Sequence, residues 1–249
     1  PEVVCLRMNP GGDFEGTNAI FDTPEGSKFG MTPTQLESAC RELAGLGVRR
    51  IGLHALLSGN THGNAYYPAL ARMLFAEAVR LHERTGVDVA FVNLSGGIGI
   101  PYEPGDDPCD IRAIGEGVRG AYEEVLVPAG MGDVAIFSEL GRFVTGPHGC
   151  LITRVLHLKR TYHDYVGVDA SAADLIRPAM YGAYHHVTVV GQEGGPSKVD
   201  APATHLYDVV GGLCENNDRF ANHRALPEVE VGDLLVIHDA GAHGRSMGY

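Results

Sequence analysis

The chain is poor in positive charge and has no long apolar run. Its 249 residues include 19 Lys and Arg against 31 Asp and Glu, a formal net charge of −12 at pH 7. This balance opposes binding to phosphate backbones and anionic membrane surfaces, so we expect neither nucleic acid nor membrane partners. The apolar runs fall far short of the roughly 20 residues that span a bilayer, and no basic-then-apolar leader opens the chain. We therefore expect a cytoplasmic protein.

Paired cysteines are also missing. The five cysteines are widely scattered and include no C-x-x-C pair: Cys5, Cys40, Cys109, Cys150 and Cys214. This pattern argues against a disulfide framework or a structural zinc site, and we expect reduced thiols. The first residue is Pro1 rather than Met, so we expect the sequence to be a cut or processed piece.

The first part of the sequence alternates predicted strands and helices. Apolar, β-branched runs predict buried parallel strands at 3–7, 50–54, 87–94 and 133–137. Helical patterns separate them, one opening at Thr32, the others covering 67–84 and 111–127. Repeats of this kind are typical of a (β/α)8 barrel, but four strands cannot close one. We expect half a barrel over residues 1–145.

The second part is predicted to be a β-domain over residues 146–249. Strand patterns separated by Gly, Pro and Asn turns occur at 150–158, 163–168, 185–190, 204–210 and 233–238. The Gly- and Pro-rich segment 191–203 is expected to form an exposed loop.

Two motifs follow predicted strands in the barrel part. In Ser95-Gly-Gly-Ile-Gly99, absent side chains would let backbone N–H groups approach an anion such as a phosphate, although a tight turn without a ligand also fits. Glu139-Leu-Gly-Arg142 stands at the strand end where barrel enzymes place their chemistry. Arg142 offers planar donors to phosphate or carboxylate oxygens, and a surface Glu–Arg pair is the alternative.

Three further motifs lie in the β-domain: Arg177-Pro-Ala-Met-Tyr181, Cys214-Glu-Asn-Asn-Asp218 and Asp239-Ala-Gly-Ala-His243. An arginine suits a carboxylate on a ligand, and a solvated arginine before a proline turn is the alternative. A thiol is a weak acid that can donate a proton, although most lone cysteines are inert. The adjacent acidic and Asn residues argue against a core position for Cys214.

The order and spacing of these motifs resemble the diaminopimelate decarboxylase family, pyridoxal phosphate (PLP) enzymes related to ornithine decarboxylase and alanine racemase. The resemblance covers nearly the whole chain and implies an α/β fold: the C-terminal half of an alanine racemase-like (β/α)8 PLP barrel followed by a β-domain. It also implies a homodimer with shared active sites. The implied activity is decarboxylation of meso-diaminopimelate to L-lysine and CO2, a step of lysine biosynthesis.

The resemblance carries roles to individual residues of this sequence. Glu139 would keep the pyridine ring protonated, because an opposite charge stabilises the charged form, and Cys214 would reprotonate the substrate carbon. The implied PLP ligands are Gly96, Gly97, Glu139, Gly141, Arg142 and His243. The implied substrate ligands are Arg142, Arg177, Tyr181 and Glu215, and the pairing of a second arginine with Glu215 suits a distal amino acid group.

Three departures from the family pattern leave alternatives open. Leu56 stands where the family has a ring-stacking histidine, with His54 and His62 as weak substitutes, and His243 replaces a tyrosine. The family's covalently bound lysine matches none of Lys28, Lys159 and Lys198, so we expect no turnover by these residues alone.

The alternatives are a sibling decarboxylase for another basic or carboxylated amino acid, and a non-catalytic homologue that binds a partner. A metal site at His238, Asp239 and His243 is disfavoured, because the family motif explains these residues better. We therefore expect no metal.

Overall fold

A computed structural model of the chain describes residues 1–12 and 24–247, which form two compact units. The first unit contains residues 1–99 and 107–140, and the second contains residues 100–106 and 141 onward. All five cysteines are free thiols. The assignment of 1–145 to cofactor binding and of 146–249 to substrate and dimer contacts stays a prediction.

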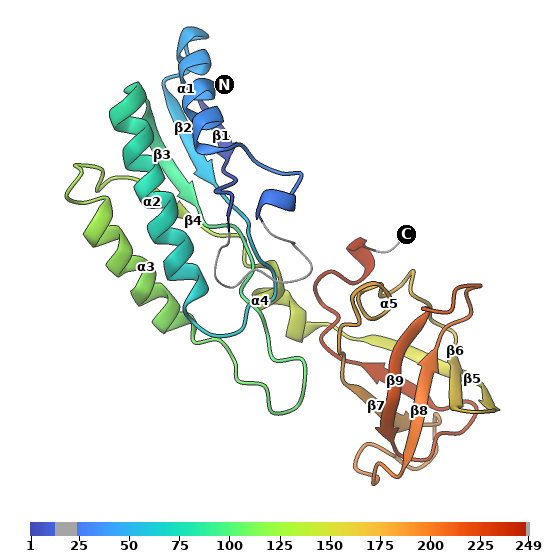
Figure 1. Cartoon of the computed structure of the whole chain (residues 1–249). Helices are drawn as coiled ribbons and strands as arrows, with labels where there is room; N and C mark the ends of the chain where they lie inside the picture. The colour runs from blue at the N-terminus through green and yellow to red at the C-terminus, as the bar shows by residue number, and fades with distance from the viewer. Residues whose placement is uncertain (13–23, 248–249) are drawn as a thin grey trace. The chain divides into compact units, whose positions relative to one another are not determined.

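The first unit is a parallel sheet with helices in its crossovers (Figure 1). Its strands pair in chain order and run β1 (Val3–Arg7), β2 (Arg50–His54), β3 (Asp88–Asn93) and β4 (Ala135–Phe137). A short 3-10 helix, η1 (Pro24–Gly26), and the helices α1 (Pro33–Gly45), α2 (Tyr66–Thr85) and α3 (Ile111–Val125) complete it. The four strands and three helices predicted from the sequence are therefore present.

Local sequence signals set the ends of these helices. Thr32 caps α1 through a capping box with Gln35, and Pro33 occupies the first turn. The Asp110 side chain accepts hydrogen bonds from the first turn of α3. Gly86 ends α2 in the left-handed conformation that glycine adopts without strain. Each boundary is thus fixed by residues within a few positions of it.

The second unit is a six-stranded sheet in the order β7-β10-β5-β6-β8-β9. Its strands are β5 (Leu151–Arg160), β6 (Asp164–Val168), β7 (Val187–Gly191), β8 (His205–Val210), β9 (Arg219–Leu226) and β10 (Leu234–Ile237). The short helical segments α4 (Gly141–Thr145) and η2 (Gly146–His148) precede these strands, α5 (Arg177–Tyr181) lies between β6 and β7, and η3 (Arg245–Met247) follows β10. Its core is built largely from valines, with Tyr207 and Phe220 fully buried.

The α/β architecture expected from the sequence is confirmed, with one strand missed. The β9 sequence, Arg-Phe-Ala-Asn-His-Arg-Ala-Leu, is half polar and lacks β-branched residues. Hydrogen-bonded pairing with β8 stabilises this strand, although its local strand propensity is low. No helix within the described ranges is long and apolar enough to cross a membrane.

Candidate functional site

Polar side chains gather at the carboxyl ends of the parallel strands in the first unit. Arg7, His54 and Asn93 end β1, β2 and β3, and Glu139 follows β4. Asn93 Nδ2 donates to Glu139 Oε1 over 2.7 Å. Burial lowers the pKa of His54, and so does the charge of Arg7, while Glu139 opposes both. A carboxylate is therefore held in place at the edge where barrel enzymes carry their chemistry.

The glycine turn after β3 packs where side chains do not fit. A Cβ atom on Gly96 would lie 2.6 Å from the Glu139 carbonyl oxygen, and one on Gly97 would lie 2.6 Å from the Ser58 carbonyl oxygen. Gly97 also has a φ of +113°, which side-chain-bearing residues rarely adopt. The turn thus brings bare backbone against the segments that follow β2 and β4.

Two buried hydroxyl groups beside this turn have unused hydrogen-bonding capacity. Within the described part of the chain, Ser58 Oγ and Ser95 Oγ have no hydrogen-bond partner. A buried polar group without a hydrogen-bond partner lowers the free energy of unfolding by roughly 1–3 kcal/mol, so such groups usually bind protein, water or a ligand. Glycine backbone and hydroxyl donors suit the phosphate of PLP, and the Glu139 carboxylate suits its pyridine nitrogen. The residues present therefore fit this cofactor.

Replacing Gly97 by alanine is expected to damage this turn. The added methyl group meets the Ser58 backbone, and alanine at this φ is strained, so we expect a loss of roughly 2–3 kcal/mol in the free energy of unfolding and weaker PLP binding. Gly120→Ala is the matched control: it lies in α3, and its Cβ would meet nothing within 4 Å. Urea unfolding of both variants and PLP titration test this. Equal stability of the two variants would contradict it.

In the second unit, two arginines share one tyrosine. Arg177 is only 4% exposed, and its guanidinium carbon lies 4.4 Å from the Tyr102 ring centre. Arg142 Nη1 donates to the Tyr102 hydroxyl. Neither arginine has a carboxylate within 4.0 Å among the residues that the structure describes. Burial lowers the pKa of Arg177 to about 10, so it stays charged at neutral pH without an anionic partner.

His185 holds the Arg177 side chain. Its Nδ1 lies 2.7 Å from the His238 carbonyl oxygen, which can only accept, so Nδ1 carries the proton. Nε2 is then free to accept from Arg177 Nη1, also over 2.7 Å. Burial, with Arg177 and other nearby guanidinium groups, lowers the pKa of His185 to about 4. A neutral imidazole therefore orients the buried arginine.

This buried imidazole predicts an acid-sensitive fold. The pKa of His185 is about 4 in the folded chain and about 6.5 when unfolded, so between these values the unfolded chain binds the extra proton. Its contribution to stability is complete above about pH 6.5 and is lost as pH falls toward 4, by up to roughly 3 kcal/mol. Urea unfolding at pH 7 and 4.5 should show a smaller loss for His185→Gln than for the unsubstituted chain. Equal losses would contradict the prediction.

The segment 211–218, which carries Cys214 and Glu215, is a surface loop held by one buried carboxylate. Asp218 is 3% exposed and accepts from the backbone N–H groups of Ala172 and Leu213, at 2.6 and 2.8 Å. Cys214 and Glu215 are exposed. The thiol lies outside the core, as the neighbouring polar residues indicated. Its roles in catalysis and dimer contact stay predictions.

His243 lies in a turn packed on the short helical segment after Gly141. A Cβ on Gly241 would strike the Thr145 carbonyl oxygen, which requires glycine there. Burial lowers the pKa of His243, and the charges of Arg142 and Arg177 lower it further. The charges of Arg142 and Arg177 thus act on His243 and favour its neutral form. The expected roles of Gly141 as a cofactor ligand and of Tyr181 as a substrate ligand stay predictions.

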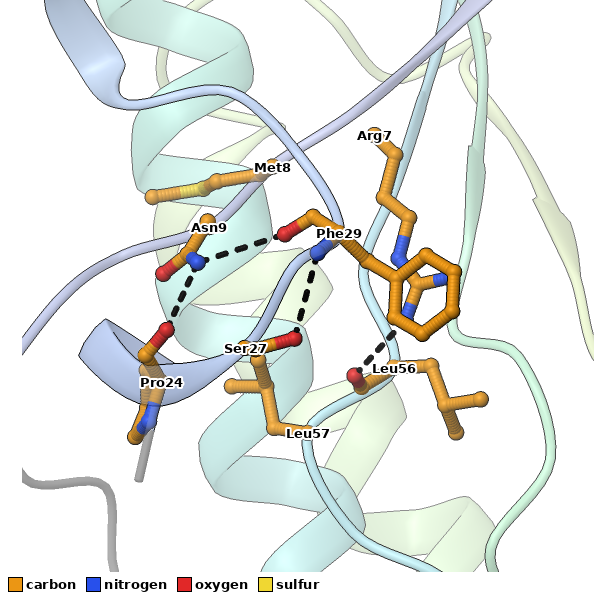
Figure 2. Close-up of a pocket in the computed structure, with 8 residues that line it drawn as sticks. All are labelled: Arg7, Met8, Asn9, Pro24, Ser27, Phe29, Leu56 and Leu57. Atoms are coloured by element: carbon orange, nitrogen blue, oxygen red, sulfur yellow. Dashed lines mark hydrogen bonds between the residues drawn. The ribbon is translucent and has the colours of Figure 1, made fainter. Parts of the chain in front are cut away.

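Leu56, at the family's ring-stacking position, lines a small pocket with Arg7 and Phe29 (Figure 2). Arg7 Nη2 donates to the Leu56 carbonyl oxygen over 3.2 Å, and its guanidinium carbon lies 4.7 Å from the Phe29 ring centre. The residue that stacks on the cofactor ring stays a prediction, with His54 at the end of β2 still a candidate.

Sequence reasoning missed several residues that position the expected site. Asn93 holds Glu139, His185 holds Arg177, and Ser58 lies under the glycine turn. Only Asn93 carried a usable signal, since a polar residue at a strand end next to a glycine run is suggestive. The other contacts join residues through tertiary packing.

Each unit thus carries its own polar features: the first has a parallel strand edge with a phosphate-type glycine turn, and the second is a β-sheet unit whose Arg142 and Arg177 have no carboxylate within 4.0 Å among the described residues. Residues 37–241 match the model of the family described as pyridoxal-dependent decarboxylase, C-terminal sheet domain, and the chain belongs to this family.

Individual relatives agree with this assignment. The chain is 34% identical to "Protein TabA" of Pseudomonas amygdali pv. tabaci over all of its own length and 57% of the relative's. It is 37% identical to diaminopimelate decarboxylase of Methanothermobacter thermautotrophicus, over 98% of this chain and 56% of that one. A crystal structure of Helicobacter pylori diaminopimelate decarboxylase complexed with L-lysine superposes with a TM-score of 0.81 at 27% identity, covering 99% of this chain and 58% of that one. The chain thus spans a little over half the length of these relatives.

Proposed function

We propose that the protein is a PLP-dependent decarboxylase that converts meso-diaminopimelate to L-lysine and CO2. The observation that carries this proposal is the buried, carboxylate-free Arg177 with Arg142, because a second cationic site suits a substrate with a distal carboxylate. Relatives named diaminopimelate decarboxylase, and an L-lysine complex of one of them, support the choice of substrate.

Residues of this chain bind the two ends of the cofactor. Bound PLP supplies an electron sink for the electron pair left when CO2 departs. Gly96, Gly97, Gly141, Arg142 and His243 bind the phosphate end of the cofactor, and Glu139 holds a proton at the pyridine nitrogen.

The substrate is held at its far end and receives a proton at its α-carbon. Arg177 and Tyr181 bind the distal carboxylate, Glu215 accepts from the distal ammonium group, and Arg142 assists. Cys214 Sγ delivers the proton to the α-carbon after CO2 has left. These roles require a homodimer if the 211–218 loop serves the partner's site.

The first test uses the product of the complete reading frame, titrated with PLP and then given meso-diaminopimelate. The bound cofactor should show a visible absorbance band that changes with substrate, and L-lysine should be released. Absence of decarboxylation for every amino acid tried would refute the proposal and favour a non-catalytic, partner-binding homologue. The 249 residues alone should not turn over, because none of Lys28, Lys159 and Lys198 lies early on a barrel strand.

A sibling decarboxylase with another substrate is the second candidate, favoured by Leu56 and His243. Rates on diaminopimelate, ornithine, lysine, arginine and carboxynorspermidine separate the two. Preference for a substrate without a distal carboxylate would assign the sibling function.

Mixing two inactive variants tests the shared dimer site. Cys214→Ala and Glu139→Gln chains, each inactive alone, should regain about a quarter of normal activity when recombined, since half of random dimers are mixed and each has one intact site. Recombination without recovery would exclude a shared site.

A further inference from the structure

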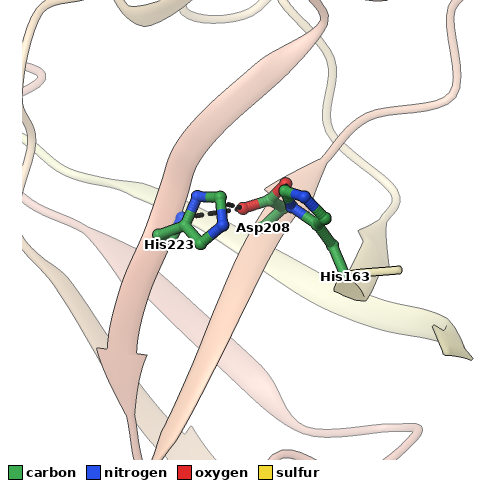
Figure 3. Close-up of side chains that lie close together, drawn as sticks. All are labelled: His163, Asp208 and His223. Carbon is green, nitrogen blue, oxygen red and sulfur yellow. Dashed lines mark hydrogen bonds and ion pairs between the residues drawn. The ribbon is translucent and has the colours of Figure 1, made fainter. Parts of the chain in front are cut away.

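Three side chains outside the proposed catalytic residues converge on the β-domain: His163, Asp208 and His223 (Figure 3). One ligand atom from each can be chosen so that all three lie within 4.8 Å of one another. His163 precedes β6, Asp208 lies in β8, and His223 lies in β9. The sheet brings them together, because β8 pairs with both β6 and β9.

An irregularity in the sheet aims His223 at this group. Tyr207 pairs with Arg224 and Val209 with Ala221, so two residues of β9 face Asp208 alone. His223 takes a φ of +45° there, an uncommon backbone conformation for a residue other than glycine. Bulges of this kind re-aim a side chain and often lie next to functional sites.

Asp208 is a buried carboxylate with a histidine on either side. It is 1% exposed. Its Oδ1 accepts from the His223 backbone N–H at 2.7 Å, and its Oδ2 accepts from His163 Nδ1 at 3.1 Å and from Arg219 Nη1 at 3.0 Å. His223 Nδ1 lies 3.7 Å from Oδ1, which is too far for a hydrogen bond. The Nδ1 atom of His223 is therefore not used by Asp208 and can bind an ion.

The spacing of these atoms suits one metal ion. Zinc bonds to histidine nitrogen and carboxylate oxygen are about 2.0–2.2 Å long, so a tetrahedral ion places two of these ligands about 3.3–3.6 Å apart. The 3.1 Å from His163 Nδ1 to Asp208 Oδ2 and the 3.7 Å from His223 Nδ1 to Asp208 Oδ1 are both close to this spacing. The 4.8 Å limit on the group requires at most a small movement of the imidazoles, and both side chains have room, being 38% and 62% exposed.

The donor set selects the type of ion. Two imidazoles and one carboxylate suit zinc-type transition metals, whereas Ca²⁺ and Mg²⁺ prefer oxygen ligands alone. The hollow beside the group is also lined by Tyr162, Asp164 and Leu206, which leaves an open side for water or a fourth ligand. The positive charge of Arg219, which donates to Asp208, disfavours binding of a cation. Arg219 also donates to Asn216 and Asn222, so it can give up its bond to Asp208 and keep these contacts.

We propose that His163, Asp208 and His223 form a binding site for a zinc-type divalent cation that ties the turn before β6 to β8 and β9. His163 moves its Nδ1 proton to Nε2 so that the Nδ1 lone pair faces the ion. No spaced sequence motif marks this site, because the three residues come from three separate strands or turns.

The test is calorimetric titration of the metal-free full chain with Zn²⁺, after alkylation of the exposed thiols. We expect one saturable site per chain, weakened at least about tenfold by His163→Gln and by His223→Asn. Asparagine is chosen at position 223 because it tolerates positive φ. His148→Gln, at an exposed histidine outside the cluster, should bind as the unsubstituted chain does.

Two further measurements complete the test. Zn²⁺ at 100 times its dissociation constant should raise the thermal midpoint by about 5 °C or more, and Mg²⁺ should not. In NMR spectra of the unsubstituted chain, the His163 and His223 imidazole signals should shift with one equivalent of Zn²⁺, a readout that no folding defect can mimic. Absence of saturable binding, or unshifted His163 and His223 signals, would overturn the proposal.

Discussion

Replacing Arg177 by methionine should lower kcat/KM for meso-diaminopimelate by about 100-fold or more, while the chain stays as stable as before. A charge-assisted hydrogen bond contributes roughly 1.5–3 kcal/mol, and 1.4 kcal/mol is a factor of ten, so losing a bidentate pair reaches this range. Stability responds differently, because Arg177 is a buried cation without a carboxylate partner within 4.0 Å in the described residues. An apolar side chain of similar length removes its desolvation cost.

The free energy of unfolding should therefore change by less than about 1 kcal/mol, or rise. Lost contacts with His185 and Tyr102 offset part of the gain. Arg154→Met is the control: its exposed side chain donates to the Gly232 carbonyl oxygen, it has no proposed role in the site, and the change should leave activity as it was. Steady-state kinetics and urea unfolding are measured on the complete protein. A parallel fall in stability and activity would show that Arg177 is structural.

Replacing Glu139 by glutamine should lower kcat about 100- to 1000-fold with little change in stability. Removing one preorganised electrostatic group from an active site commonly has this effect. Glutamine keeps a carbonyl oxygen that accepts from Asn93 Nδ2, so the side chain stays in place while the negative charge is lost. The exposed position of Glu139 makes a folding defect unexpected.

Kinetics and a pH titration of the bound cofactor's absorbance check this prediction together. The ring should lose its proton at lower pH in Glu139→Gln than in the unsubstituted protein. Glu124→Gln, which removes an exposed carboxylate paired with Arg72, is the matched control. An unchanged absorbance titration would mean that Glu139 does not face the ring nitrogen.

The order of secondary structure could largely be predicted from the sequence, because its signals are local. The strand runs at 3–7 and 50–54 and the caps at Thr32 and Asp110 depend on residues within one turn or strand. The motifs around Gly96, Glu139 and Arg177 could be found for the same reason, since each is a short contiguous run.

Contacts between distant residues were decided by the tertiary structure alone. Strand β9 has weak propensity and forms through pairing with β8, and this pairing also brings His223 beside Asp208. His185 orients Arg177 because the backbone carbonyl of His238, which lies 53 positions later, fixes its proton. Hydrogen bonds and burial depend on which residues lie close together in the folded chain. Sequence spacing does not predict this proximity when the partners lie on different strands.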